Sequence, residues 1–411
     1  MSRSPDVPLG FSCLIWLCAV SLAIASPKHE ETAAKPEEKA SPSAITEIEG
    51  FAKLARRAAD ENKWPLADHF LSMLGCVDAP VAAKKAAFRR LAEDYERLHQ
   101  GSKAIAVYEK MAQLYSNDPD TPKLTFHLGL LYRQSGAPKL AVARFYTVLN
   151  STLKFGANGL DAYKALAQQA QWEIAETYFQ SNDIEKAQNY YRLLSRLDLP
   201  ATEMVRVKFK LLHCLLLTKD LAGTITAAQD FLKTYPDDPA TAECRYLLAT
   251  TFRAQGRNGE AFEVVLALLN HEGAHKEKTP EKWIYWKKKA GNEFANFYYQ
   301  QGETLSALTL FQAIARLDEE ADWQWPVIYQ MGLCFERLRH SGRAAEAYKF
   351  IIEEAKKPGR ENDKLSEPLR TVLEMAQWRS DQLTWSGAAT AKLESLLTNP
   401  LAPLETETQK H

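Results

Sequence analysis

The residues best suited to chemistry in this sequence are two histidines that flank a glutamate, in segment 271–275 (HEGAH). Histidines four residues apart share one face of a helix, where both imidazoles can bind zinc and the glutamate can act as a general base. The surrounding sequence does not favour a helix here, because Gly273 weakens it and Pro280 follows a charged stretch. The sequence therefore predicts a solvated loop and no metal site, and a zinc-dependent hydrolase using His271 and His275 is the alternative.

The other histidine and cysteine residues with potential chemistry are better explained by packing in a helical protein than by an active site. His213 and Cys214 are adjacent in a helical pattern, and we interpret them as a packed pair rather than a catalytic couple. The chain has no P-loop, no Gly-x-Gly-x-x-Gly and no Gly-x-Ser-x-Gly motif. The cysteines beyond the first 25 residues are widely spaced and are expected to be buried thiols without disulfides; they are Cys76, Cys214, Cys244 and Cys334. The sequence predicts no enzyme activity and no cofactor.

Length and composition limit the fold class and the kind of partner. The chain has 411 residues, with 51 basic residues, 52 acidic residues and only 18 glycines. This length exceeds one globular core, so several domains or a repeat array is expected. The balanced charge argues against a nucleic-acid partner and against a strongly membrane-adsorbed surface. Abundant alanine, leucine, glutamate and lysine favour an all-α protein.

The stretch 124–150 predicts two short amphipathic helices joined by a tight turn. Leu128, Gly129 and Tyr132 mark one face of the first helix, and Gly136 ends it. The second helix carries a buried stripe at spacings of four and three residues, formed by Ala141, Phe145 and Val148. The small residues in each helix allow two backbones to approach closely. This order, Leu-Gly-x2-Tyr followed by Ala-x3-Phe, resembles the tetratricopeptide repeat (TPR).

The same pattern recurs when each segment is aligned on the apolar residue equivalent to Leu128. The aligned residues are Leu54, Leu91, Leu128, Ile174, Leu211, Leu248, Phe294 and Met331. The next position is small in all but one segment, with Ala55, Ala92, Gly129, Ala175, Leu212, Ala249, Ala295 and Gly332. A second small position lies in the following helix, with Ala67, Ala104, Ala141, Ala187, Thr224, Ala261, Ala307 and Ala344. A position for bulky residues comes four residues later, with Leu71, Tyr108, Phe145, Tyr191, Ala228, Val265, Phe311 and Tyr348. The resemblance to TPR proteins covers residues 46–354 and implies a right-handed α-solenoid of about eight helix pairs.

The spacing of the aligned residues suggests a longer repeat. The intervals are 37, 37, 46, 37, 37, 46 and 37 residues, so the pattern also has a period of 120 residues. We interpret this period as duplication of a three-repeat unit, with chance as the alternative. The inserts after Asn150 and Asn270 should precede unusually long helices, 160–179 and 280–300, about two turns longer than the other first helices. Two tryptophans lie on the added turns of the second long helix, Trp283 and Trp286.

The two ends of the chain differ from the array. Residues 1–25 have the order of a secretory signal peptide, with Arg3 before an apolar run and small residues at 23–25. The run is shorter than the roughly 20 residues of a spanning helix, so no integral membrane segment is expected after cleavage; an uncleaved anchor is the alternative. Residues 26–45 should be a disordered leader. Two helices, 365–385 and 388–397, should form a cap at 365–397 before a flexible tail at 398–411.

The resemblance implies a non-catalytic scaffold that binds protein or peptide partners in a concave groove. In TPR proteins this groove is lined by first-helix positions that include the one two residues before the aligned residue. That position carries an aromatic side chain in several repeats, namely Phe126, Trp172, Phe209, Tyr246 and Tyr329. Positive charge should flank this row, from Lys123, Arg133, Arg206 and Arg253. We expect a groove for a segment with apolar and acidic side chains; packing between repeats is the alternative role of the aromatic row.

Segment 234–239 (TYPDDP) resembles the linker of bacterial periplasmic TPR proteins that serve the cell envelope. Together with the signal peptide, it predicts an exported protein, periplasmic or secreted. A remaining alternative is an array that serves only homo-oligomer assembly through its ends.

Overall fold

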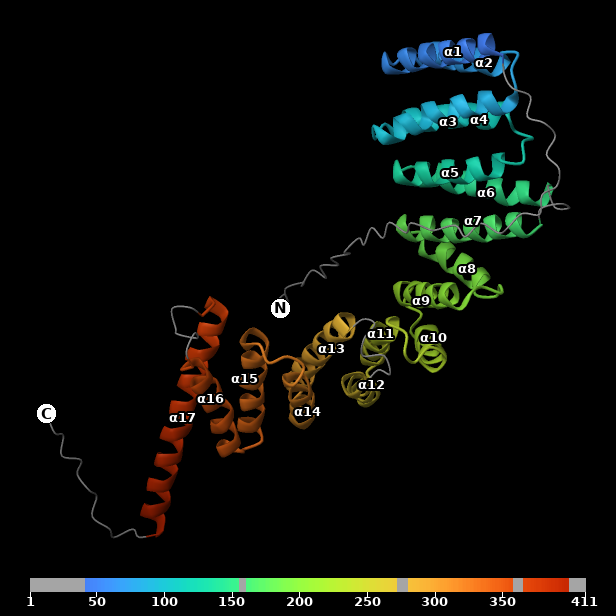
Figure 1. The fold of residues 1–411 in the computed structure, drawn as a ribbon. Coiled ribbons are helices and arrows are strands. Elements are labelled where there is room, and N and C mark those ends of the chain that lie inside the picture. The colour runs from blue at the N-terminus through green and yellow to red at the C-terminus, as the bar shows by residue number, and fades with distance from the viewer. Residues whose placement is uncertain (1–40, 155–159, 272–279, 358–364, 399–411) are drawn as a thin grey trace, which may run out of the picture. The chain divides into compact units, whose positions relative to one another are not determined.

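The computed structural model describes residues 41–154, 160–271, 280–357 and 365–398, and these residues form helices without any strand (Figure 1). The prediction of an all-α array is confirmed. The proposed signal peptide, residues 26–40 of the leader and residues 399–411 of the tail lie outside the described residues. No helix among the described residues is long and apolar enough to cross a membrane.

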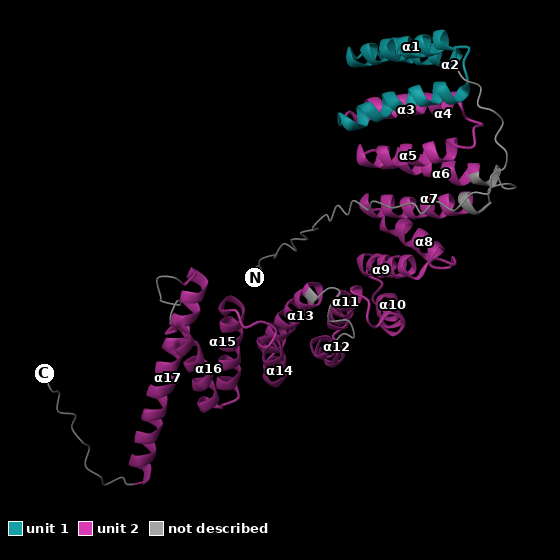
Figure 2. Ribbon diagram, in the orientation of Figure 1, with its two compact units in different colours: residues 1–99 teal, residues 100–411 magenta. Residues whose placement is uncertain are grey.

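The described helices fall into two compact units (Figure 2). Unit 1, residues 1–99, contains α1 (Pro42–Asp60), α2 (Trp64–Cys76) and α3 (Val81–Arg97). Unit 2, residues 100–411, begins with α4 (Gly101–Leu114), α5 (Thr121–Gln134), α6 (Pro138–Lys154), α7 (Leu160–Gln180), α8 (Ile184–Leu194), α9 (Ala201–Leu217) and α10 (Leu221–Thr234). It continues with α11 (Ala240–Ala254), α12 (Asn258–Asn270), α13 (Pro280–Gln300), α14 (Thr304–Ala315), α15 (Ala321–Arg337), α16 (Ser341–Ala355) and α17 (Glu367–Thr398).

The turn inside each helix pair is built around one residue with a left-handed backbone. These residues are Asn62, His99, Gly136, Asn182, Lys219, Gly256, Gly302 and Arg339, each eight positions after the aligned apolar residue. In seven of these turns the next backbone N–H bonds back over five residues; that of Lys63 donates to the Ala58 carbonyl at 2.8 Å, and that of Asp183 to the Tyr178 carbonyl at 2.9 Å. This arrangement satisfies the last carbonyls of the first helix and reverses the chain within a few residues.

The positions aligned for close packing are buried in every segment. All residues named above at the two small positions and at the bulky position are buried. A Cβ atom added to Gly129 would overlap the Phe145 ring, and one added to Gly332 would overlap the Tyr348 ring. The absent side chain at these glycines is therefore what lets the bulky residue of the second helix seat against the first helix.

We predict that Gly332→Ala lowers the free energy of unfolding by about 1–2 kcal/mol, because the overlap with Tyr348 outweighs the gain in helix propensity. Gly342→Ala is the matched control. Gly342 also lies in a helix, but a Cβ there meets no atom within 4 Å, so this substitution should leave stability equal or raise it by up to about 1 kcal/mol. Denaturant unfolding followed by circular dichroism compares the two; equal losses would contradict the close packing at Gly332.

The helix boundaries repeat at the predicted interval. As expected, α7 and α13 are the longest first helices, with 21 residues each. The difference of two turns holds for α5 and α11, with 14 and 15 residues, but α3, α9 and α15 have 17 and are only about one turn shorter, and α1 has 19. The starts of α9 and α15, Ala201 and Ala321, are 120 residues apart, as are those of α10 and α16, Leu221 and Ser341. These starts follow the 120-residue interval of the aligned residues, and the duplication itself stays a prediction.

Both ends of the described array differ from the predicted boundaries. Helix α1 begins at Pro42, inside the range assigned to the leader, because Ser41 caps it by accepting a bond from the Ala44 N–H at 3.2 Å. The two predicted cap helices are one continuous helix, α17. Gly387 does not end this helix, since neighbouring residues such as Ala388 and Ala389 favour helix and no proline interrupts it.

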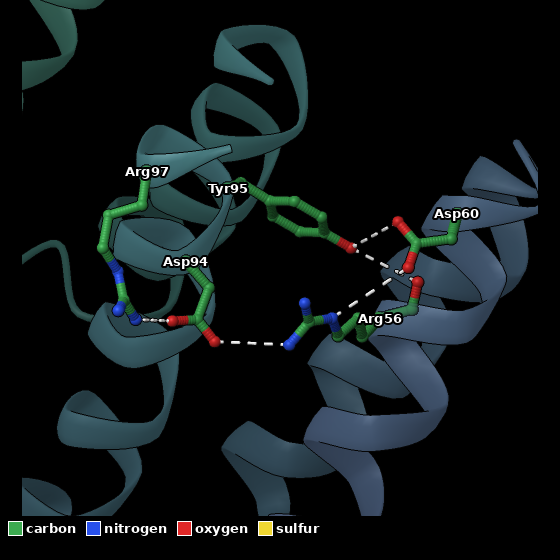
Figure 3. A network of polar contacts seen from close by, with 5 residues as sticks. All are labelled: Arg56, Asp60, Asp94, Tyr95 and Arg97. Carbon is green, nitrogen blue, oxygen red and sulfur yellow. Dashed lines mark hydrogen bonds and ion pairs between the residues drawn. The ribbon is translucent and has the colours of Figure 1, made fainter. Parts of the chain in front are cut away.

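Polar contacts link the first helices of unit 1 (Figure 3). The Arg56 guanidinium in α1 lies 3.3 Å from the Asp94 carboxylate in α3, and Asp94 also pairs with Arg97. The Tyr95 hydroxyl donates toward the Arg56 carbonyl at 3.3 Å and the Asp60 carboxylate at 3.4 Å. Burial raises the pKa of Tyr95 to about 12, so this hydroxyl stays a donor. Contacts of the same kind recur between the first helices of unit 2.

Candidate partner-binding surface

The histidine of the HEGAH segment that the structure describes has a packing role. His271 follows α12, and its ring stacks on Trp283 at 4.6 Å with an interplanar angle of 18°. Its carbonyl accepts a bond from the Lys287 Nζ at 2.8 Å. Burial lowers the pKa of His271. The remainder of the segment, including His275, lies outside the described residues, within which no three His, Cys, Asp or Glu side chains are placed to hold a metal.

His213 and Cys214 lie in different environments. Cys214 is fully buried, whereas His213 packs edge-on against Phe209 at 4.8 Å and lies 3.4 Å from the Glu243 carboxylate. Burial raises the pKa of Cys214 to about 12, which leaves the thiol protonated and unreactive near neutral pH. Their interpretation as packed helix residues agrees with this geometry.

The four cysteines are free thiols, but the prediction that all are buried is wrong for Cys76. Cys76 is the last residue of α2 and lies outside the buried stripe of Ala67, Leu71 and Leu74. Burial raises the pKa of Cys244 to about 12 and that of Cys334 to about 11.

We predict that a thiol-alkylating reagent at pH 8 modifies Cys76 in the folded protein and spares the other three. A thiol with a pKa of about 12 carries roughly one thiolate in ten thousand at that pH. Peptide mass analysis before and after unfolding in denaturant measures the labelling. Rapid labelling of Cys214 in the folded state would contradict its burial.

The predicted aromatic row is partly exposed, with one exception. Phe126, Trp172, Phe209 and Tyr246 are each partly buried, so neighbouring helices do not fully enclose them. Three of them pack on the second helix of their own pair: Phe126 on Phe145 at 5.5 Å, Trp172 on Tyr191 at 5.7 Å and Phe209 on Phe231 at 5.6 Å. Each of these side chains thus contributes to packing while part of it remains accessible.

Tyr329 does not belong to the accessible row. It is 9% exposed, packs on Tyr348 at 5.6 Å and joins a cluster that includes Leu369 and Leu373 of α17. The terminal helix covers the position that is left partly open in the preceding repeats. Tyr329 is therefore not part of the candidate surface.

Two of the three flanking arginines are engaged in ion pairs. Arg133 on α5 pairs with Glu173 on α7, and Arg253 on α11 lies 2.6 Å from the Glu293 carboxylate on α13. Burial raises the pKa of Glu173 although Arg133 lowers it. The expectation of flanking positive charge is wrong for these two arginines, because each cation is matched by a carboxylate 40 residues later. Their main effect is to join successive first helices.

Arg206 is the arginine that keeps its charge available. It is exposed, and its guanidinium lies 4.6 Å from the centre of the Trp172 ring. No ion pair involves Arg206 within the residues that the structure describes. Trp172 thus contacts both the Tyr191 ring and the Arg206 guanidinium; we call these three residues the Trp172 cluster. A guanidinium over an indole is a favourable cation–π contact.

A second cluster, which the sequence pattern did not identify as a site, surrounds Lys289. The Lys289 ammonium lies 5.0 Å from the ring of Tyr246, 4.9 Å from Trp286 and 5.9 Å from Tyr285. Tyr246 packs on Trp286 at 5.2 Å, and its hydroxyl donates to the Glu293 carboxylate at 2.7 Å. We call Tyr246, Tyr285, Trp286 and Lys289 the Lys289 cage. Tyr285 is 56% exposed. The run WIYWKKK on the added turns of α13 is the sequence signal for this cage.

Comparison with known proteins adds a likeness of fold at low similarity. No family model matches the chain, and no curated protein does. A tetratricopeptide repeat protein from Parabacteroides merdae is 13% identical, with 71% of this chain and 97% of that chain covered and a TM-score of 0.38. YrrB, described as a TPR protein with an unusual peptide-binding site, is 16% identical, with 44% of this chain and 81% of that chain covered and a TM-score of 0.32. The TPR domain of P58(IPK) is 16% identical, with 82% of this chain and 98% of that chain covered and a TM-score of 0.23.

Proposed function

We propose that this array of TPR-type helix pairs is a non-catalytic scaffold of the cell envelope, and that it binds partner segments with apolar and acidic side chains. The binding surface is formed by first helices α7, α9, α11 and α13 and carries the Trp172 cluster and the Lys289 cage. The observation that carries this proposal is that each cluster sets at least one partly exposed aromatic ring beside an exposed cation, and neither cation forms an ion pair among the described residues.

The chemistry of the two clusters selects the partner. Tryptophan, tyrosine and arginine are the residue types that most often anchor protein interfaces. Arg206 and Lys289 offer positive charge beside apolar ring surface, so an acidic side chain next to an apolar one satisfies both. Arg133 and Arg253 contribute little attraction, because Glu173 and Glu293 neutralise them. The charge of the surface therefore depends on Arg206 and Lys289.

A peptide array tests the binding preference. The probes are short peptides that alternate leucine and glutamate, the same peptides with lysine in place of glutamate, and the same with serine in place of leucine. The protein should bind the first set, and Lys289→Glu should abolish that binding. Lys282→Glu is the matched control, since Lys282 is an exposed residue on the same helix outside the cage. Equal binding of all three sets, or equal losses in both variants, would contradict the proposal.

The envelope location rests on residues 1–25 and on the linker at 234–239. Processing of a signal peptide should produce a mature protein whose first residue is Ser26, recovered from the periplasm or the medium. Amino-terminal sequencing after cell fractionation tests this, and a cytosolic protein that retains Met1 would refute the location while leaving the peptide-binding proposal open.

A further inference from the structure

The C-terminal half of α17 is a long helical surface without a partner in the described chain. Its first half packs on α15 and α16 through Leu369, Val372, Leu373 and Ala376. After Leu383 every described residue of the helix is exposed, and Figure 1 shows this half continuing past α15 and α16. Trp378 is 57% exposed and Trp385 70%. Fifteen residues of unsupported helix are marginal in water, so these side chains are better explained by an interface.

One row of exposed residues runs along α17 at the spacing of a helix-pairing seam. The row is Trp378, Asp381, Trp385, Ala388, Lys392 and Ser395, with alternating steps of three and four residues. Such steps keep side chains on one face of a helix. The buried face, marked by Ala376 and Leu383, lies on the opposite side of the helix at 100° per residue. A second helix could therefore cover the row without displacing α15 or α16.

The row is complementary to the same row on a second, antiparallel copy of α17. When two copies run antiparallel about the midpoint between Ser386 and Gly387, Trp378 faces Ser395, Trp385 faces Ala388 and Asp381 faces Lys392. Each large ring meets a small residue, which leaves space for it. Each carboxylate meets an ammonium, and two-fold symmetry repeats every contact. Parallel pairing would instead oppose tryptophan to tryptophan and like charge to like charge at the same positions.

We infer that a second copy of this chain covers this face of α17, in an antiparallel pair of α17 helices with two-fold symmetry. The seam spans about 27 Å of helix, at 1.5 Å per residue over 378–395. The pair joins two arrays through their C-terminal helices and leaves the Trp172 cluster and the Lys289 cage outside the contact. This dimer does not depend on the proposed peptide binding, and each can fail without the other.

Charge reversal tests the pairing in the full chain by sedimentation equilibrium. Asp381→Lys places lysine opposite Lys392 twice in the dimer, and Lys392→Asp places aspartate opposite Asp381 twice. Each single variant should raise the dimer dissociation constant by more than about tenfold. The double variant D381K/K392D restores opposite charges and should return the constant to within about threefold of the original.

Glu394→Lys is the matched control, because Glu394 is an exposed residue of the same half-helix on the face away from the seam. It should leave the dissociation constant unchanged. Circular dichroism should show equal helix content in all variants. A monomeric mass for the unmodified chain at the highest soluble concentration overturns the proposal, as does a double variant that stays as weak as the single ones.

Discussion

Replacing Phe145 by alanine should lower the free energy of unfolding by about 4 kcal/mol. Phe145 is fully buried in α6, seats against Gly129 and packs on Phe126 at 5.5 Å. Gly129, which lies directly opposite the ring, has no side chain that could move into the cavity. Denaturant unfolding followed by circular dichroism measures this loss of stability.

Leu140→Ala is the control for this substitution. Leu140 lies on the same helix but is 52% exposed, so removing it should change the stability by no more than about 0.5 kcal/mol. Each pair in a repeat array contacts mainly its neighbours, so hydrogen exchange in Phe145→Ala should increase first in α5 and α6. An equal loss in the two variants would show that α6 packs with a different face.

The double substitution Trp172→Ala with Tyr246→Ala should weaken binding of the acidic apolar peptide by about 100-fold. Trp172 supports Arg206 at 4.6 Å, and Tyr246 forms one wall of the cage around Lys289. Without these rings Arg206 loses the indole beneath it, Lys289 loses one of its three aromatic contacts, and the apolar side chains of the peptide lose contact area. Fluorescence anisotropy of the labelled leucine–glutamate peptide measures the affinity.

The matched control removes two large exposed side chains elsewhere in unit 2. This control is the double variant Leu140→Ala with Leu305→Ala. Both leucines lie on second helices, and their exposed fractions are 52% and 68%. This control should bind the peptide as the unmodified protein does. Tyr246 also donates to Glu293, so unchanged helix content and unfolding midpoint must accompany the loss of binding. A normal affinity in the Trp172 and Tyr246 variant would exclude this surface.

The sequence pattern predicts the packing of each helix pair because that packing repeats. Ala141 and Phe145 take the positions of Ala261 and Val265, and all four are buried. Residue size at fixed spacing is enough to predict such contacts, since two helices can cross closely only where one side chain is small. The long helices α7 and α13 follow from the same regularity together with the two inserts.

Contacts between repeats are harder to predict, because the partner belongs to another repeat. The pairing of Arg133 with Glu173 depends on where the next first helix lies. When each repeat is considered alone, Arg133 has no partner and its charge is predicted to be exposed. The Lys289 cage likewise combines α11 with the added turns of α13. Tyr329 fits the aromatic row by spacing, and only the cover provided by α17 distinguishes it.

A site-specific crosslink tests whether partners bind on the first-helix surface. A photoreactive amino acid replaces Tyr285, at the exposed edge of the Lys289 cage, or Leu140, an exposed residue on second helix α6. After irradiation of intact cells, mass spectrometry identifies the attached protein and the attached residues. Position 285 should capture a segment rich in apolar and acidic residues, and position 140 should not. Capture of the same segment at position 140 with none at position 285 would contradict binding on the first-helix surface.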